Sequence, residues 1–428
     1  MLDLKGKKIL VVGLGISGFS AARLLSGKGA LVKVTENDDN DTIRDYAEKL
    51  SEFAVEIEIG GHTEDFFKFP DMVVTSPGVD NGALPLAFAR KNDIPVIGEL
   101  ELGWMFCASP IIAVTGTNGK TTTTELIGKI LLNSGKGAVV CGNIGNPLTG
   151  EIEDLARDKI AVVEVSSFQL DTIKKFKPYI AVLLNVTDDH YERHENYENY
   201  KNSKFRIFLN QDENDWAVLN SSFRNDQALR NIRSRKSFFK KEDCADLESV
   251  PLKGDHNLEN IACAVAVAGI MGISKADAYR TIAAFKGLGH RFEIIGTFGG
   301  IEFIDDSKAT NIDATKRALE SVDKKVVLIA GGRDKGGDYR SVSSVIKEKV
   351  SAMVLIGEAA GRIKNAFSDD VNIVVAHTMQ DAVRKASSIA KKGEIVMLSP
   401  MCSSFDMFSS YKQRGEIFKS SVLSLKRD

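Results

Sequence analysis

The sequence predicts an α/β protein of three domains, each built around a mostly parallel sheet. Its 428 residues suffice for about three domains of roughly 150 residues each. Strand-length runs recur along the chain, and most are continuously apolar, as in strands covered on both faces. Helix-period stretches with polar faces separate them, which is the βαβ order of a parallel sheet. The expected strands are 8–12, 31–35, 72–75, 111–114, 160–165, 180–185, 216–219, 325–329, 352–356 and 395–398.

Two joints divide the chain into these domains. A short apolar run ends at Gly98, and a glycine-rich joint lies at 287–289. Composition shifts of this kind mark the exposed connections between compact blocks. We therefore expect domains at 1–97, 98–287 and 288–428.

Charge and cysteine content restrict the ligands and the setting. Lys and Arg number 56 against 58 Asp and Glu, so the net charge of −2 gives no electrostatic reason to expect a nucleic-acid or membrane partner. Five scattered cysteines without C-x-x-C spacing fit reduced thiols and a cytoplasmic location. We expect no signal peptide and no membrane insertion, because the longest apolar stretch, 261–273, falls short of the about 20 residues a bilayer requires. That stretch is expected to form a buried helix.

A glycine-rich turn opens the first domain. The motif GLGISG (13–18) follows the strand at 8–12, and Glu36 ends the second strand. The pattern is a dinucleotide fingerprint, in which a nucleotide diphosphate lies at a helix N-terminus and the carboxylate reaches the ribose. NAD is only one candidate, since any nucleotide diphosphate meets the same physics. The alternative is a tight turn whose glycines serve only packing.

A second glycine-rich turn, AVTGTNGKTT (113–122), predicts a nucleoside triphosphate site. Gly116 and Gly119 allow the backbone N–H groups to point inward at phosphate oxygens, and Lys120 adds a point charge. Thr121 offers a hydroxyl to Mg²⁺ at the start of a helix, whose dipole also favours the anion. The loop is a variant of G-x-x-x-x-G-K-[ST], because Val114 occupies the position of the first glycine.

Acidic and imidazole side chains follow the next two strands. Glu164, near the end of the strand at 160–165, is positioned to reach a metal held by Thr121; the alternative is a solvated strand-end carboxylate. His190 and His194 have helical spacing around Glu192, but their order is wrong for the zinc motif H-E-x-x-H. We therefore expect only His190 to be functional, with His194 and its neighbour on a solvated face.

A lysine and three loops complete the candidate groups. Taken by itself, Lys204 is an ordinary lysine of an amphipathic helix. In the third domain, DDSKATN (305–311), GGRDKGGD (331–338) and SPMCSSFD (399–406) each follow a strand, where parallel sheets bind ligands. Their clustered Lys, Ser and Thr side chains suggest an acidic substrate.

The order of these motifs resembles the Mur ligases over essentially the whole chain. The matching segments are GLGISG, TSPGVD, VTGTNGKTTT, GNIG, VEVSSFQL, LNVTDDHYERH, NSKFRIF, GDHNLENI, GLGHRFE, DDSKATN, GGRDKGGD and LSPMCSSFDMF. The paired segments GGRDKGGD and LSPMCSSFDMF look most like the D-glutamate-adding member.

The resemblance implies an ATP-dependent amide ligase of cytoplasmic peptidoglycan precursor synthesis. Its substrates would be UDP-N-acetylmuramoyl-L-alanine and D-glutamate, joined through an acyl phosphate with two Mg²⁺ sites, and the protein would be a monomer. The implied architecture is a Rossmann-like UDP-substrate domain, a central P-loop-type ATPase domain and a Rossmann-like C-terminal domain that closes on the amino acid.

The resemblance also assigns residues. The catalytic set is Lys120, Glu164, His190 and Lys204. The metal ligands are Thr121 and Glu164 at one site, and His190 and a carbamylated Lys204 at the other. ATP would contact Gly116, Thr117, Asn118, Gly119, Lys120, Thr121, Thr122, Asn257, Asn260, Arg291 and Asp306. The UDP substrate would contact Ser17, Glu36, Asn37, Gly78, Asn143 and Ser166. D-Glutamate would contact Lys308, Thr310, Lys335, Ser404, Phe405 and Tyr411.

Two departures and three alternatives remain at this point. Glu36-Asn37 stands where an Asp-Thr pair is more usual, which puts the uracil contacts in doubt, and Tyr411 stands where Phe is familiar. A sibling ligase, folylpolyglutamate synthetase included, would use another amino acid or carboxylate. An NAD-dependent oxidoreductase would explain GLGISG but not the second phosphate loop. A non-catalytic nucleotide-binding scaffold is disfavoured by the catalytic set.

Overall fold

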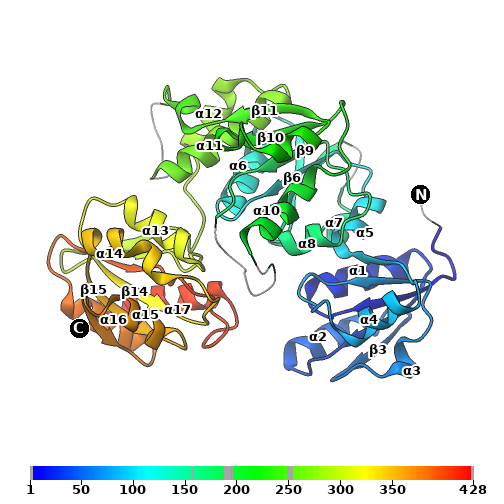
Figure 1. Cartoon of the computed structure of the whole chain (residues 1–428), viewed down its shortest axis with the longest axis horizontal. Coiled ribbons are helices and arrows are strands. Elements are labelled where there is room, and N and C mark those ends of the chain that lie inside the picture. The colour runs from blue at the N-terminus through cyan, green and yellow to red at the C-terminus, as the bar shows by residue number, and fades with distance from the viewer. Residues whose placement is uncertain (1–2, 156–157, 188–193, 195, 248–253, 426–428) are drawn as a thin grey trace. The chain divides into compact units, whose positions relative to one another are not determined.

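The α/β fold class is confirmed in the computed structural model, which describes residues 3–155, 158–187, 194, 196–247 and 254–425. Figure 1 shows the helices and strands along the chain. The chain divides into two compact units. One comprises Met1–Asn185, Lys201–Lys240 and Ile261–Thr281, and the other comprises Val186–Tyr200, Lys241–Asn260 and Ile282–Asp428. The predicted domain boundaries stay predictions.

The first sheet is fully parallel, in the order β3-β2-β1-β4-β5. Its strands are β1 (Lys8–Val12), β2 (Leu31–Glu36), β3 (Val55–Ile59), β4 (Met72–Thr75) and β5 (Val96–Gly98). Its helices are α1 (Ile16–Gly27), α2 (Asp41–Leu50), α3 (Glu64–Phe67) and α4 (Leu84–Lys91). Along β1, Ile9 and Val11 pack with α1 and α2, whereas Leu10 and Val12 pack with α3 and α4. The chain order reverses between β1 and β4, which is where such sheets bind ligands.

The second sheet is also parallel, in the order β11-β10-β9-β6-β8-β7. Its strands are β6 (Ile111–Thr115), β7 (Gly137–Gly142), β8 (Lys159–Glu164), β9 (Ile180–Leu183), β10 (Trp216–Asn220) and β11 (Arg235–Phe239). The accompanying helices are α5 (Glu99–Phe106), α6 (Lys120–Asn133), α7 (Leu148–Glu151), α8 (Ser167–Asp171), α10 (Tyr197–Phe205), α11 (Asp255–Ile270) and α12 (Lys275–Ala283). Because β6 lies between β8 and β9, the loop that follows β6 is flanked by the carboxyl ends of both neighbours.

Two buried carboxylates anchor α5 within this unit. The Glu99 Oε1 atom accepts hydrogen bonds from the backbone N–H and the hydroxyl of Thr149, at 2.8 and 2.7 Å. Glu101 accepts three consecutive backbone N–H groups, from residues 174–176, at 2.8 to 2.9 Å. Burial raises the pKa of Glu99. These bonds tie α5 to α7 and to the segment after α8.

The third sheet is mixed, in the order β12-β13-β17-β14-β15-β16, with only the β12–β13 pair antiparallel among the described strands. Its strands are β12 (Glu293–Phe298), β13 (Ile301–Asp305), β14 (Val326–Gly331), β15 (Val350–Ile356), β16 (Asn372–Val375) and β17 (Ile395–Leu398). Its helices are α13 (Ile312–Glu320), α14 (Ser343–Lys349), α15 (Ala360–Phe367), α16 (Met379–Ile389) and α17 (Tyr411–Ser424). Alternate residues of β14 pack with α13, α14 and α15 on one face and with α16 and α17 on the other. Short 3₁₀ helices lie at Arg206–Phe208, Ser221–Phe223, Gln227–Asn231, Lys241–Cys244 and Tyr339–Val342.

Every expected strand is present, with ends that differ by no more than about two residues. Several others were not predicted, among them β3 and β12. The apolar stretch at 261–273 forms much of α11, as expected, with Ile261 and Cys263 fully buried. In the described part of the chain, no helix is long and apolar enough to cross a membrane.

Candidate functional site

The phosphate loop joins β6 to α6. Gly119 is the N-cap residue of α6 and has φ +86°, in the left-handed region that favours glycine. A methyl group on Gly116 would lie only 3.0 Å from the Cβ of Leu184, so the loop passes close to the segment after β9. The turn at the N-terminus of α6 therefore needs glycine at both positions, and its role as a phosphate cradle stays a prediction.

Two lysine ammonium groups converge on one loop carbonyl. Lys120 Nζ donates to the carbonyl oxygens of Gly116 and Thr117, at 2.9 and 2.8 Å. Lys204 Nζ, from α10, also donates to the Gly116 oxygen at 2.9 Å. Lys204 is only 1% exposed, so it is no ordinary surface lysine of an amphipathic helix. The two cations give the loop a local positive charge that suits a polyphosphate.

Glu164, a predicted metal ligand, is a buried carboxylate with one oxygen that has no hydrogen-bond partner among the described residues. Glu164 ends β8 and is 1% exposed, so the alternative of a solvated strand-end carboxylate is wrong. Its Oε1 atom accepts a 2.7 Å hydrogen bond from Asn143 Nδ2, while Oε2 is buried with no partner among the described residues. An orphaned carboxylate oxygen is costly unless a cation or water satisfies it, so the site fits a divalent metal. Thr121 lies half-buried in the first turn of α6.

The histidine predictions have different outcomes. His190, which was expected to be functional, lies outside the described residues, and so does Glu192. The expectation of a solvated His194 is wrong, because this side chain is 7% exposed and its ring lies 5.2 Å from that of Tyr200.

The turn after β1 holds a carboxylate. Glu36 Oε2 accepts the backbone N–H of Leu14 at 2.6 Å, and Oε1 accepts that of Asp38 at 2.9 Å. A methyl group on Gly18 would overlap the carbonyl oxygen of Gly13, whereas one on Gly15 would meet no atom within 4 Å. Packing thus explains Gly18, whereas Gly15 faces open space.

The other residues assigned to the UDP substrate differ in exposure and in hydrogen bonding. Ser17 is half-buried in α1, and Gly78 is exposed after β4. Asn37 is exposed, next to Glu36. Ser166 caps α8: its hydroxyl accepts the N–H of Gln169, whose side chain bonds back to the Ser166 backbone. Ser166 therefore has a structural task that its place in the motif did not reveal.

In the second compact unit, Asp306 is held in a desolvated position. Its carboxyl oxygens accept from Ser399 Oγ at 3.0 Å and from the Phe292 backbone N–H at 3.2 Å. Desolvation raises the pKa of Asp306 to about 7. On α11, Asn260 Nδ2 donates to Asn257 Oδ1 at 3.3 Å, so these two predicted ATP contacts lie together.

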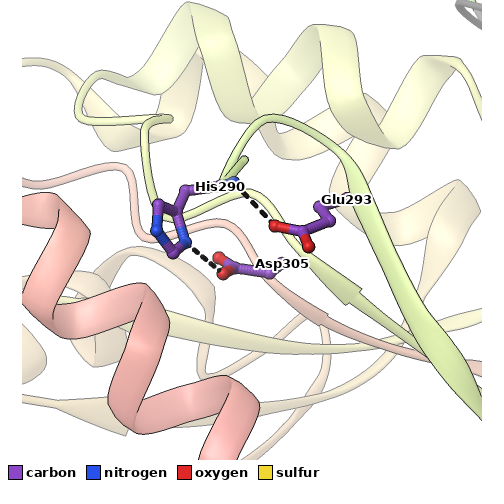
Figure 2. A group of neighbouring side chains, drawn as sticks. All are labelled: His290, Glu293 and Asp305. Atoms are coloured by element: carbon purple, nitrogen blue, oxygen red, sulfur yellow. Dashed lines mark hydrogen bonds and ion pairs between the residues drawn. The ribbon is translucent and has the colours of Figure 1, made fainter. Parts of the chain in front are cut away.

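Sequence reasoning missed a cluster beside Arg291. Figure 2 shows His290, Glu293 and Asp305, in which His290 Nδ1 lies 2.7 Å from Asp305 Oδ2. The His290 N–H donates to Glu293 at 3.0 Å, and the His290 carbonyl accepts the backbone N–H of Lys308 at 3.1 Å. Desolvation raises the pKa of Asp305. The cluster thus fixes the backbone that leads into the DDSKATN segment. Its members lie in the GLGHRFE and DDSKATN segments, but nothing in those segments indicated that the three side chains would meet.

The residues assigned to D-glutamate form two groups. A pocket of about 450 Å³ is lined by Lys335 together with the start of α13 and the loop after β14. Of the other assigned residues, Lys308 Nζ lies 3.9 Å from the centre of the Tyr411 ring, and neither lines that pocket among the described residues. Ser404 is buried, whereas Phe405 is 63% exposed. Thr310 is half-buried.

Arg414 joins these segments and was also missed. It is 1% exposed, and it donates to Ser307 Oγ at 3.0 Å, to the Ser307 carbonyl at 2.7 Å and to the Cys402 carbonyl at 3.2 Å. Burial lowers its pKa to about 10. Arg414 therefore ties α17 to two of the predicted ligand loops.

Known protein families match this chain along most of its length. Three domain families match successive parts of the chain: a Mur ligase MurD-like N-terminal domain at 7–98, a Mur ligase middle domain at 114–238, and a Mur ligase glutamate ligase domain at 290–402. The UDP-N-acetylmuramoylalanine–D-glutamate ligase of Pelotomaculum thermopropionicum is 42% identical over 99% of each chain.

Solved structures share the fold. The UDP-N-acetylmuramate–alanine ligase MurC of Thermotoga maritima aligns with a TM-score of 0.62 at 19% identity, over 98% of this chain and 100% of that one. The MurF ligase of Thermotoga maritima, in complex with ADP, aligns with a TM-score of 0.62 at 15% identity over 100% of both chains. The chain belongs to the Mur ligase family, and within that family to the UDP-N-acetylmuramoylalanine–D-glutamate ligases.

Proposed function

We infer that the chain is an ATP-dependent ligase that adds D-glutamate to UDP-N-acetylmuramoyl-L-alanine in peptidoglycan precursor synthesis. The observation that carries this inference is the match to D-glutamate ligases along the whole chain. The lysine-lined loop before α6, beside the buried Glu164 carboxylate, supports the use of ATP. We propose that the protein works as a monomer in the cytoplasm.

ATP makes the amide bond possible, because a carboxylate and an ammonium group do not condense in water. The substrate carboxylate attacks the γ-phosphorus; a C–O–P linkage forms, the bond to the β-phosphate oxygen breaks, and ADP leaves. The amine of D-glutamate, having lost a proton, then attacks the acyl carbon. The C–N bond forms, the C–O bond breaks, and phosphate leaves.

The residues of the chain have separate tasks in this route. Lys120 and the loop N–H groups bind the triphosphate and hold the γ-phosphoryl group in place. Further ATP contacts are assigned to Asn257, Asn260, Arg291 and Asp306. The UDP substrate is bound by Ser17, Glu36, Asn37, Gly78, Asn143 and Ser166. Lys308 and Lys335 neutralise the two carboxylates of D-glutamate and leave its amine free. The other contacts to D-glutamate come from Thr310, Ser404, Phe405 and Tyr411.

Two Mg²⁺ sites belong to this proposal. Thr121 and Glu164 would hold one ion, and the unused Glu164 oxygen supports that assignment. His190 and a carbamylated Lys204 would hold the other. Bound Mg²⁺ supplies positive charge that offsets the repulsion between the substrate carboxylate and the γ-phosphate.

The amino-acid specificity is tested by phosphate release. Purified enzyme, ATP, Mg²⁺ and UDP-N-acetylmuramoyl-L-alanine are combined in turn with D-glutamate, L-alanine, L-lysine and meso-diaminopimelate. Only D-glutamate should stimulate ATP-dependent release. Stimulation by another of these amino acids, with none by D-glutamate, would overturn the assignment.

The carbamate is tested by replacement and rescue. Addition of CO₂ to Lys204 Nζ would turn a cation that repels Mg²⁺ into an anionic oxygen ligand. Lys204→Ala should lose activity, and short carboxylic acids should restore part of it by entering the vacated space. Lys201→Ala is the matched control, since Lys201 lies on the same helix and pairs with Asp226 at 2.6 Å. Full activity of Lys204→Ala, or no rescue, contradicts the carbamate.

A further inference from the structure

The side chain of Asn185 extends the central sheet into the phosphate loop. Main-chain pairing between β6 and β9 continues past both strands, because the Leu184 N–H donates to the Thr115 carbonyl at 3.0 Å and the Thr117 N–H donates to the Asn185 carbonyl at 3.0 Å. One residue further, the Asn185 carboxamide replaces the backbone. Its Oδ1 atom accepts the Asn118 N–H at 2.9 Å, and its Nδ2 atom donates to the Asn118 carbonyl at 3.0 Å.

This pair of bonds has a chemical requirement. A carboxamide presents an acceptor and a donor side by side, which matches the N–H and C=O of one backbone residue. A carboxylate would set an oxygen against the Asn118 carbonyl, and an aliphatic side chain would leave both backbone groups without these partners. Asn118 lies next to Gly119, the N-cap residue of α6, so whatever fixes its two peptide planes also fixes the first N–H groups of the cradle.

We propose that Asn185 is a positioning residue of the ATP site: its carboxamide clamps the Asn118 backbone so that the loop N–H groups are set for the triphosphate before ATP binds. Asn185 acts through the loop. Lys120 stabilises the same loop from its carbonyl side, through the Gly116 and Thr117 oxygens. Asn185 thus fixes the N–H groups of the loop, while Lys120 binds its carbonyl oxygens. Because the loop is already ordered, ATP binding loses less conformational entropy.

The test separates ATP binding from general stability. Asn185→Leu removes both bonds with little change of volume. It should raise the KM for ATP and the dissociation constant of ADP by about 10- to 100-fold, because nucleotide binding must then supply the order that the two hydrogen bonds gave the free loop. The KM values for the UDP substrate and D-glutamate should stay within about twofold. Asn220→Leu is the matched control: Asn220 ends β10, the strand beside β9, and its side chain accepts the Ser222 N–H at 3.0 Å. It should leave the KM for ATP unchanged.

A second variant keeps the proposal testable if Asn185→Leu folds poorly. In Asn185→Asp, a protonated carboxyl group again offers one donor and one acceptor, so ADP affinity relative to wild type should recover as the pH falls from 7 to 5. A merely structural role would produce no such recovery in the ratio of affinities. If Asn185→Leu binds ADP as wild type does, or if Asn185→Asp shows no recovery, the proposal is wrong.

The inference rests on the proposed function, because it takes ATP as the ligand of the loop. The two can fail separately. If the wild-type protein binds neither ATP nor ADP in calorimetry, the proposed function fails. If wild type binds and Asn185→Leu binds equally well, only the role of Asn185 fails.

Discussion

The turn after β1 and the loop after β6 look alike in sequence and differ in charge. Each follows a buried parallel strand, contains glycines and leads into a helix. In the first, the Leu14 N–H is taken by the Glu36 carboxylate. In the second, the lysines at 120 and 204 share the Gly116 carbonyl. In this structure a carboxylate contacts the first turn, whereas two lysine side chains contact the second.

The difference shows that glycine spacing gives the shape of a nucleotide site but not its ligand. A carboxylate within a turn repels phosphate, and it suits a donor such as a sugar hydroxyl or a base N–H. Ammonium groups beside a helix N-terminus suit a polyphosphate. This contrast supports our proposal that the first turn takes the nucleoside side of the UDP substrate, with the diphosphate near Gly15, and that the second takes ATP.

The largest expected effect, on kcat/KM for ATP, comes from removing the lysine charge of the second loop. Lys120→Ala should lower kcat/KM for ATP by about 10²- to 10³-fold, the range for loss of one preorganised group at a developing charge. Steady-state kinetics at saturating UDP substrate measure the change. Lys129→Ala is the control, since Lys129 is exposed on the same helix. A decrease of less than about fivefold would mean that the charge of the second loop does not serve ATP.

The next prediction concerns packing in the first turn. Gly18→Ala places a methyl group against the Gly13 carbonyl, so the free energy of unfolding should fall by about 1–3 kcal/mol. Gly27→Ala, at the end of the same helix, meets no atom within 4 Å and should be neutral or stabilising. Urea denaturation compares the two. Equal stability of both variants would contradict a packing role for Gly18.

Much of this comparison could be predicted from the sequence, but the contacts that Lys204 and Glu36 make with the two turns could not. The runs 9–12 and 111–114 are continuously apolar because helices cover both faces, so their pattern identified the two strands. The edge strands β3 and β12 are only partly buried and lack that pattern. Burial of Lys204, like that of Arg414, depends on elements distant in the chain, and a lone cation in an amphipathic helix has the pattern of a solvated one. Glu36 was predicted at a ribose, yet its bond to Leu14 arises only when β1 and β2 pair.

A smaller effect separates binding from packing within the first turn. The methyl group of Gly15→Ala would have no atom within 4 Å, so the melting temperature should stay within about 2 °C of wild type. The methyl group would instead occupy the space where a diphosphate approaches the backbone, and the KM for the UDP substrate should rise by about tenfold. The KM for ATP should not change, because ATP uses the second loop. An unchanged KM for the UDP substrate would leave Gly15 without a binding role.

The smallest expected effect tests the charge of the first turn directly. In Glu36→Gln the side chain keeps its length but loses its negative charge and sets an amide group against one of the two N–H donors, of Leu14 or Asp38. Charge-assisted bonds are about twice as strong as neutral ones, so the KM for the UDP substrate should rise by about three- to tenfold while the KM for ATP stays constant. Glu58→Gln is the matched control, because Glu58 likewise accepts a backbone N–H, from Thr63 at 3.1 Å, at the neighbouring strand β3. If Glu36→Gln bound the UDP substrate more tightly, its carboxylate would be repelling the diphosphate rather than holding the turn, and the first turn would resemble the second after all.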